Sequence, residues 1–234
     1  MSTRAGSLDV LNSEIVECRR CPRLVRYREE VARVKRRAFR DWEYWGRPVP
    51  GFGDARAELL IIGLAPAAHG GNRTGRVFTG DRSGDFLFAA LHRAGFASQP
   101  RSERRDDGLQ LRNAYIVAAC RCAPPENKPL PREVLNCRPY LERELETLSP
   151  RAVLALGKFA FDAFLALLQA RGEIAIRARF RFFHGASYAL NTASAGRLFA
   201  VFHPSQQNTQ TGKLTPLMYD RALRGIRNFL EAGG

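Results

Sequence analysis

"ELLIIGLAPAAHGGNRTGRVFTGDRSGDF" spans Glu58–Phe86 and contains the pattern that decides the fold class predicted for this chain. The apolar run Leu59–Leu64 leads into a loop that is rich in Gly and Ala. A short run of this kind, apolar at every position, is typical of a strand buried on both faces of a parallel sheet. The loop after it could hold something flat or anionic, although its centre, Leu64–Ala67, carries no acid or base.

Apolar runs of the same type recur along the chain, at Tyr115–Ala119, Val153–Leu156 and Leu198–Phe202. Helical patterns occur before, between and after them, at residues 8–38, 83–95 with Ser83 as N-cap, 131–148, 158–170 and 215–232. This alternation predicts a three-layer α/β fold around a small parallel sheet. Ligands bind such sheets at the carboxyl ends of the strands, which points to the loops 63–78, 120–125 and 203–214.

The length of 234 residues indicates one domain, which we divide into an N-terminal helical extension (8–54) and an α/β core (55–231). The polar stretches 98–108 and 171–181 are expected to be surface loops or insertions. No run of 18 apolar residues and no signal-peptide pattern is present, so we expect a soluble, cytoplasmic protein without a membrane partner.

The chain is strongly basic, with 37 Lys and Arg against 23 Asp and Glu and a net charge of +14. A codon preference explains why most of these bases are Arg, but it does not explain the excess of bases over acids. Such an excess favours a polyanionic partner, and nucleic acid is the first candidate.

Five cysteines in a chain of this kind argue against disulfides and for a metal centre or catalysis. Cys18 and Cys21 form a C-x2-C pair, and Cys122 and Cys137 lie about a hundred residues further on. Four thiolates can hold either zinc or an iron–sulfur cluster, and the spacing does not distinguish the two. Cys120 ends an apolar strand and is expected to be a small buried residue instead.

The loop after the first strand, "GGNRTGR", suggests a phosphate-binding function through Arg73 and Arg76. It lacks both the Walker A sequence and the dinucleotide-binding glycine pattern, so a nucleotide cofactor is disfavoured. Phe78 could stack on a base, although packing in the core is the more common role of a phenylalanine.

His203 directly follows the last apolar run and opens the polar stretch "HPSQQNTQTGKLT". Such a histidine is often structural, but at a strand end it can donate to an oxygen that gains negative charge. Four residues after it are candidates for phosphate contacts: Ser205, Gln206, Gln207 and Asn208. Asn113 begins the second strand and could read a base edge, unless it only forms a turn.

With these motifs assembled, the chain resembles a family 5 (B-type) uracil-DNA glycosylase of the uracil-DNA glycosylase superfamily. The resemblance rests on "GLAPAAHGGNRTGRVFTGD", "CRCAPPENKPLPREVLNCRPYL", "HPSQQNTQTGKLT" and the C-x2-C pair. It implies a four-stranded parallel sheet flanked by helices. It also implies a [4Fe–4S] cluster that ties the N-terminal segment to the core through Cys18, Cys21, Cys122 and Cys137.

The resemblance further implies a monofunctional enzyme that flips uracil out of double-stranded DNA and hydrolyses the N-glycosidic bond. Leu64, Ala65 and Phe78 would wall the base pocket, Asn113 would read the base, and His203 would stabilise the departing anion. Related families carry an acid or amide where this chain has Leu64 and Ala65, so we expect a less selective pocket that also accepts hypoxanthine. We expect a monomer that associates with the nucleoid. A non-catalytic iron–sulfur protein that binds nucleic acid or transfers electrons is the alternative.

Overall fold

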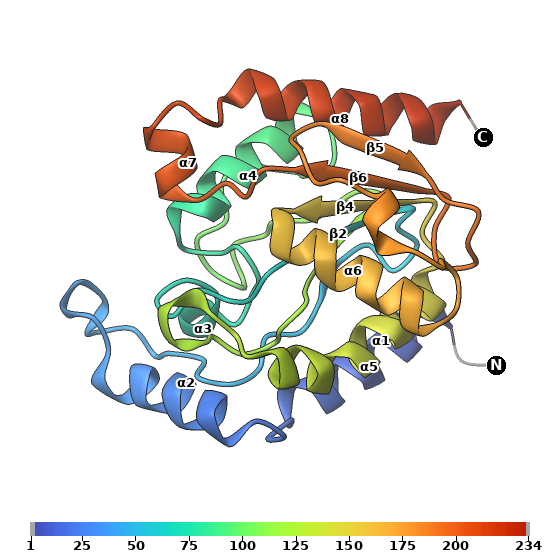
Figure 1. The fold of residues 1–234 in the computed structure, drawn as a ribbon. Helices are drawn as coiled ribbons and strands as arrows, with labels where there is room; N and C mark the ends of the chain where they lie inside the picture. The colour runs from blue at the N-terminus through green and yellow to red at the C-terminus, as the bar shows by residue number, and fades with distance from the viewer. Residues whose placement is uncertain (1–2, 233–234) are drawn as a thin grey trace.

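The centre of the molecule is a mixed sheet of six strands in the order β1-β3-β2-β4-β6-β5, in a computed structural model that describes residues 3–232 (Figure 1). The four inner strands run parallel to one another: β2 (Leu59–Gly63), β3 (Ala114–Ala118), β4 (Ala152–Leu156) and β6 (Arg197–Val201). All four correspond to the apolar runs of the sequence. Their carboxyl ends therefore lie along one edge of the sheet.

The two outer strands correct the prediction that the sheet is four-stranded and wholly parallel. β1 (Phe52–Gly53) and β5 (Ala186–Ala189) pair antiparallel with β3 and β6. β1 is two residues long and comes from the predicted N-terminal extension. β5 has only one fully buried residue and carries no β-branched side chain, and it follows the polar stretch 171–181 that was expected to be a surface loop or insertion. Neither strand therefore has the apolar pattern that revealed the inner four.

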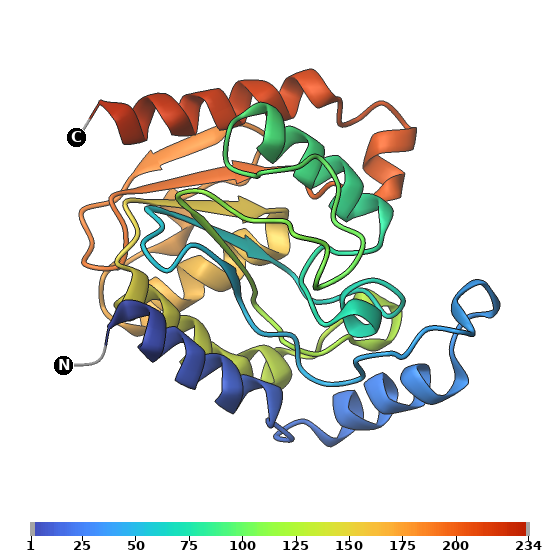
Figure 2. The ribbon, with the colours of Figure 1, turned by 180° about the vertical axis from the view of Figure 1, so that it is seen from behind.

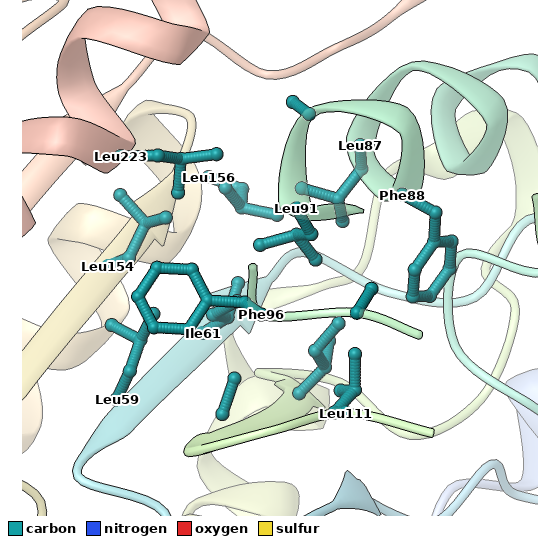
Figure 3. Packing of buried hydrophobic residues seen from close by; sticks show 14 of the residues in the cluster. Leu59, Ile61, Leu87, Phe88, Leu91, Phe96, Leu111, Leu154, Leu156 and Leu223 are labelled. Atoms are coloured by element: carbon teal, nitrogen blue, oxygen red, sulfur yellow. The ribbon is translucent and has the colours of Figure 1, made fainter. Parts of the chain in front are cut away.

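Alternate residues of the inner strands point to opposite faces of the sheet, and each face has its own core. Leu59 and Ile61 pack with Leu87 and Leu91 on one face, where Leu223 joins them (Figure 3). The other face, which begins with Leu60 and Ile62 of β2, packs against a second apolar cluster. The predicted three layers follow from these two cores.

Helices cover both faces of the sheet, as Figures 1 and 2 show. The first core lies under α4 (Arg82–Arg93) and α8 (Pro216–Glu231), which contact each other. The second core lies under α5 (Pro131–Leu148) and α6 (Lys158–Ala170), and α1 (Arg4–Val16) packs on α5. The short elements are α3 (Gly71–Thr74), α7 (Gln206–Gln210), η2 (Pro125–Asn127) and η3 (Arg177–Arg179).

The predicted N-terminal helix is two helices. α1 ends before the C-x2-C pair, and α2 (Pro22–Val34) begins with Cys21 as its N-cap and a proline at its first position. The short turn η1 (Arg37–Phe39) follows α2. In Figure 1, α2 and the turn after it form an arm that projects from the end of the molecule where the inner strands have their carboxyl ends. α7 lies at the same end, and the loop after β2 lies between α7 and the arm.

The ends of the other helices agree with the sequence, with one exception. α5 begins at Pro131 and continues through Pro139, and α8 begins after the N-cap Thr215. The N-cap of α4 is Asp81 rather than Ser83, because the Asp81 carboxylate accepts a hydrogen bond from the Gly84 N–H at 2.9 Å. Among the described residues, no helix has both the length and the apolar character needed to span a lipid bilayer.

Candidate active site

A pocket of about 460 Å³ opens at the carboxyl edge of the sheet, where the predicted loops 63–78 and 203–214 meet; the predicted loop 120–125 contributes no residue to it. Of the residues predicted to contact a base, Leu64, Ala65, Phe78 and His203 line it. Asp81 and Asn127 also line the pocket, although the sequence motifs did not indicate either of them as a site residue. The pocket thus combines an apolar wall, an aromatic ring and a small set of polar groups, as small-molecule sites usually do.

Phe78 is held in place by two glycines. Its φ angle is 51°, in the left-handed region that bulky residues rarely adopt. A Cβ atom at Gly63 would lie 2.7 Å from the Phe78 ring, and a Cβ at Gly84 would overlap the Phe78 carbonyl oxygen. The chain therefore keeps glycine at both positions so that the ring can reach the pocket, 5.9 Å from the His203 ring.

His203 is a neutral imidazole, because burial lowers its pKa to about 4. Both backbone groups of the preceding residue are hydrogen-bonded: the Phe202 N–H donates to Nδ1 of His184 at 3.2 Å, and the Phe202 carbonyl accepts from the Tyr219 hydroxyl at 2.9 Å. The His203 carbonyl accepts from the Asn208 side chain at 2.8 Å. His203 therefore enters the pocket on a rigid backbone, as a hydrogen-bond donor that carries no charge.

Asn127 lies two residues beyond the predicted loop 120–125, at the end of η2. Its φ angle is 56°, and asparagine tolerates this conformation better than most residues. The available signal was the turn sequence "PPEN" after a buried strand. Asp81 supplies a carboxylate to the same pocket, and burial raises its pKa.

Asn113 does not face this pocket, which contradicts its predicted role as the base-reading residue. It precedes β3 and lies at the amino edge of the sheet. Its side-chain oxygen accepts from the Glu58 N–H at 2.7 Å, and its side-chain nitrogen donates to the Glu58 carboxylate at 2.9 Å. This hydrogen bond and Arg151 lower the pKa of Glu58. Both polar atoms of the Asn113 side chain are thus hydrogen-bonded to Glu58 and do not reach a base in the pocket.

Arg73 and Arg76 are also not available for phosphates, although both were predicted to contact DNA. They are 3% and 2% exposed. Arg76 forms an ion pair with Asp107 at 2.7 Å and donates to Ser102 and Thr79. Asp107 and Ser102 lie in the stretch 98–108, so this arginine holds a predicted surface loop against the core.

Arg73 has a different structural role. Its guanidinium lies between the rings of Phe39 and Trp42, 3.9 and 4.0 Å from their centroids, and donates to the carbonyls of His69 and Gly80 at 2.8 Å. Burial lowers the pKa of Arg73. The arginine therefore joins the turn after α2 to the loop after β2.

Of the four residues predicted for phosphate contacts after His203, three line the pocket: Ser205, Gln206 and Gln207. The Ser205 hydroxyl accepts from the Asn208 N–H and caps α7, and both glutamines are exposed. The Asn208 side-chain nitrogen donates to the His203 carbonyl, its N–H donates to Ser205, and its carbonyl accepts from the Leu214 N–H, so Asn208 serves the loop itself.

Four of the five cysteines gather beside the pocket, on the arm side, whereas Cys18 packs in a separate cluster with Ile15 and Tyr140. Cys21, Cys122 and Cys137 pack with Cys120 and Leu24 in one cluster. Ala65, which lines the base pocket, packs against the same cluster. Cys120 is buried, as expected, and its thiol interacts with that of Cys137.

Two nitrogen donors point at the predicted ligand set. The Arg28 guanidinium donates to Sγ of Cys122 at 2.9 Å, and the Asn136 amide donates to Sγ of Cys21 at 3.3 Å. Burial raises the pKa of Cys122 to about 12, whereas the Cys120 thiol lowers that of Cys137 to about 7. Within residues 3–232, no group of three or more His, Cys, Asp or Glu side chains is arranged as ligands of a metal ion.

Comparison with known proteins gives the family. The model of the uracil DNA glycosylase superfamily matches residues 50–227. A type-5 uracil-DNA glycosylase of Mycobacterium leprae is 54% identical over 229 residues, 97% of each chain. One of Thermus thermophilus is 51% identical over 207 residues, 88% of this chain and 90% of that protein. A type-4 uracil-DNA glycosylase of Archaeoglobus fulgidus is 27% identical over 200 residues, 85% of this chain and 82% of that protein.

Proposed function

Because the chain belongs to the uracil-DNA glycosylase superfamily, and to its type-5 branch, we propose that it excises uracil from DNA as a step of DNA repair. The observation that carries the mechanism is the neutral His203 in a pocket walled by Phe78 and closed by Asn127. The resemblance stated from the sequence motifs is confirmed by this family membership. The proposed reaction is hydrolysis of the N-glycosidic bond, which leaves an abasic site.

The target base must leave the double helix before it can enter this pocket, because its glycosidic bond cannot be reached inside a duplex. Flipping costs a few kcal/mol and costs least at a mismatch such as uracil opposite guanine. In the proposed complex the base lies against Phe78, and the loop of residues 209–215 after α7 fills the gap left in the stack. Thr211, Gly212 and Lys213 of this loop are exposed.

Bond cleavage leaves negative charge on the uracil and positive charge on the sugar. A neutral His203 donates a hydrogen bond to the base oxygen as this charge grows, and Asn127 offers the donor and acceptor that were expected from Asn113. Leu64 and Ala65 bring no charge to the sugar. Asp81 is a carboxylate of the pocket that could orient the attacking water or face the sugar cation.

The substrate range follows from the apolar wall. Leu64, Ala65 and Pro66 present no hydrogen-bonding side chain. An apolar wall of this kind does not strongly discriminate between bases that differ in their polar groups. We therefore extend the proposal to other deaminated bases in double-stranded DNA, including hypoxanthine. Equal amounts of duplexes with uracil, hypoxanthine or xanthine test this, and excision of uracil alone contradicts it.

We also propose that Cys18, Cys21, Cys122 and Cys137 hold a [4Fe–4S] cluster. Three of these thiols pack together and two receive N–H donors, which suits thiolates on a cluster. Cysteine thiolates are the usual ligands of such a cluster, and these four would hold it. When bound, the cluster contributes structural cross-links between the base of α2, the loop after β3 and α5. Iron and sulfide analysis of protein purified without air tests this assignment.

The decisive experiment measures abasic sites in a duplex with one uracil–guanine pair. Wild-type protein should release uracil and leave an alkali-labile site, whereas His203→Ala should reduce the single-turnover rate by about 10²–10³-fold. His92→Ala is the matched control, because His92 is exposed on α4 and does not line the pocket. Near-full activity of His203→Ala would refute the role given to this imidazole.

A further inference from the structure

The base pocket continues into a second groove. A hollow of about 500 Å³ shares Asp81, Arg82 and Asn127 with the pocket. Its other side is formed by the N-terminal arm, which we define as residues 22–42, through Tyr27, Arg36 and Phe39. Figure 1 shows the arm on the same side as the strand carboxyl ends. A DNA strand whose flipped base enters the pocket would therefore lie beside the arm.

The arm carries both paired and unpaired arginines. Arg23 forms an ion pair with Glu133 at 2.7 Å, and Arg33, in the last turn of α2, pairs with Glu30 at 2.6 Å, whereas Arg26 is exposed without an ion pair among the described residues. Its tip, residues 36–40, has three exposed arginines, Arg36, Arg37 and Arg40. Within residues 3–232, no carboxylate lies within 4.0 Å of their charged nitrogens. The tip therefore presents positive charge that the described part of the protein does not neutralise.

The tip is held in a fixed position. Arg73 is enclosed by Phe39 and Trp42, as described above, and the Tyr44 hydroxyl bonds with Nδ1 of His69 at 3.1 Å. The Arg36 N–H donates to the same hydroxyl at 3.4 Å. Burial, and then the charges of Arg36 and Arg73, lower the pKa of His69, which places the Arg36 charge beside the pocket loop. A preformed surface of this kind loses little conformational freedom on binding.

The acids of the groove do not offset this charge at the tip. Asp85 comes from α4, and its surroundings include Arg82 and Arg101. Glu126 comes from η2 and pairs with Lys128 at 3.1 Å. Arg82 itself is exposed on the shared side of the groove. The arm and α4 thus both bring arginines to the rim, with the base pocket between them and α7.

From this placement we propose that the arm tip is a phosphate clamp for the DNA strand that carries the flipped nucleotide. Arg36, Arg37 and Arg40 contact backbone oxygens next to the target, and Arg73 holds the tip at a fixed distance from Phe78. The proposal rests on the proposed function only in taking DNA as the substrate. It gives the N-terminal extension a role in binding DNA, separate from any role of its cysteines.

The test uses two triple variants with equal loss of charge. Arg36→Ala/Arg37→Ala/Arg40→Ala removes the clamp. Its control replaces Arg177, Arg179 and Arg181, which are likewise exposed arginines, on and just after the short turn η3, without an ion pair within the described residues. η3 packs against α6, and none of these three arginines lines the base pocket or the groove beside it. The probe is a short fluorescent duplex without uracil, and its Kd is measured by anisotropy over a series of salt concentrations.

We expect the arm variant to raise Kd by about tenfold or more near physiological salt, and to reduce the slope of log Kd against log salt by up to about 3, roughly one per lost phosphate contact. The control should stay within about twofold. The arm variant should also excise uracil slowly at low protein concentration and recover as protein is added. Equal Kd values and slopes for the two variants would overturn the clamp.

The outcome separates this proposal from the proposed function. A wild-type protein that binds DNA through the arm but releases no uracil would overturn the activity and leave the clamp. Uracil release by a protein whose DNA binding does not depend on the arm would overturn the clamp and leave the activity. Thermal melting of both variants checks that they are folded, and Arg→Gln replacements at the same three positions should reproduce the loss because they keep a polar side chain and remove the charge.

Discussion

Asn113 and Asn127 flank the same strand, β3, and both adopt positive φ angles, 52° and 56°. Asn113, at the amino edge of the sheet, spends its amide on Glu58. Asn127, beyond the carboxyl edge, lines the base pocket with His203. The two residues are therefore alike in type and backbone conformation, and their roles differ because they lie at opposite ends of the strand. In a parallel sheet, an asparagine after the strand can serve a ligand, whereas one before it supports the fold.

The largest expected effect separates these two asparagines. Asn127→Ala should lower the single-turnover rate of uracil excision by about 10²–10³-fold, because it removes a polar contact to the base in the transition state. Asn113→Ala should instead lower the free energy of unfolding by about 1–3 kcal/mol, since the Glu58 N–H loses its acceptor. Rates measured with excess enzyme and urea unfolding curves give the two quantities.

The reverse pattern would break the comparison. If Asn113→Ala abolished excision by a folded protein while Asn127→Ala left it intact, the assignment of the pocket would be wrong. Asn127→Asp gives a sharper second variant, because it keeps the shape and adds a charge that opposes an anionic leaving group.

A smaller effect is the pH dependence of stability that His203 causes at the carboxyl edge of the sheet. Below its ordinary pKa near 6.5, the imidazole of unfolded His203 takes up a proton, whereas the folded one stays neutral down to about pH 4. The unfolded state then binds more protons, so stability falls as pH decreases through this window, by up to about 3 kcal/mol. His203→Asn should lose less stability than wild type between pH 7 and pH 4. Urea midpoints at each pH measure the difference, and parallel curves would contradict it.

The next effect tests the packing that aims Phe78 into the pocket. Gly63→Ala places a methyl group against the ring and should cost about 1–3 kcal/mol of stability, together with a weaker affinity for the base. Free-uracil inhibition of excision and thermal unfolding measure the two losses. An unchanged inhibition constant would show that the ring position does not depend on Gly63.

The smallest effect is the control for that substitution. Gly225→Ala in α8 meets no atom within 4 Å, and the position has ordinary helical backbone. Alanine should therefore raise the free energy of unfolding by up to about 1 kcal/mol, because it favours the helix more than glycine does. Excision by this variant should equal that of wild type, which isolates the effect of Gly63 from that of adding a methyl group in general.

The fold was predictable where one residue pattern was sufficient. The four inner strands and the later helices followed from apolar runs and helix-start residues such as Thr215. β1 was not predictable, because Phe52 and Gly53 are a strand only by pairing with β3. The N-cap of α4 was placed at Ser83 because serine is as good a cap as aspartate, and only the hydrogen bond to Gly84 selects Asp81.

The site was predictable in its loops and less so in its side chains. His203, Phe78, Leu64 and Ala65 lie where strand ends predicted them. Arg73 and Arg76 are buried because their partners come from distant parts of the chain, such as Asp107, and no local pattern reports such a pairing. Asn113 was predicted because it stands beside a strand, but it comes before that strand, and an asparagine in this place lies at the amino edge of a parallel sheet.

Ala65 has a consequence for the lifetime of the enzyme. One small side chain stands between the thiols and the cavity that receives the damaged base. Thiols that are oxidised become larger and more polar, and this change would press on the cavity wall directly. Oxidative stress would then inactivate the repair protein through its sulfur atoms while it multiplies the lesions in DNA, so survival of the activity depends on keeping the four cysteines of this cluster unoxidised.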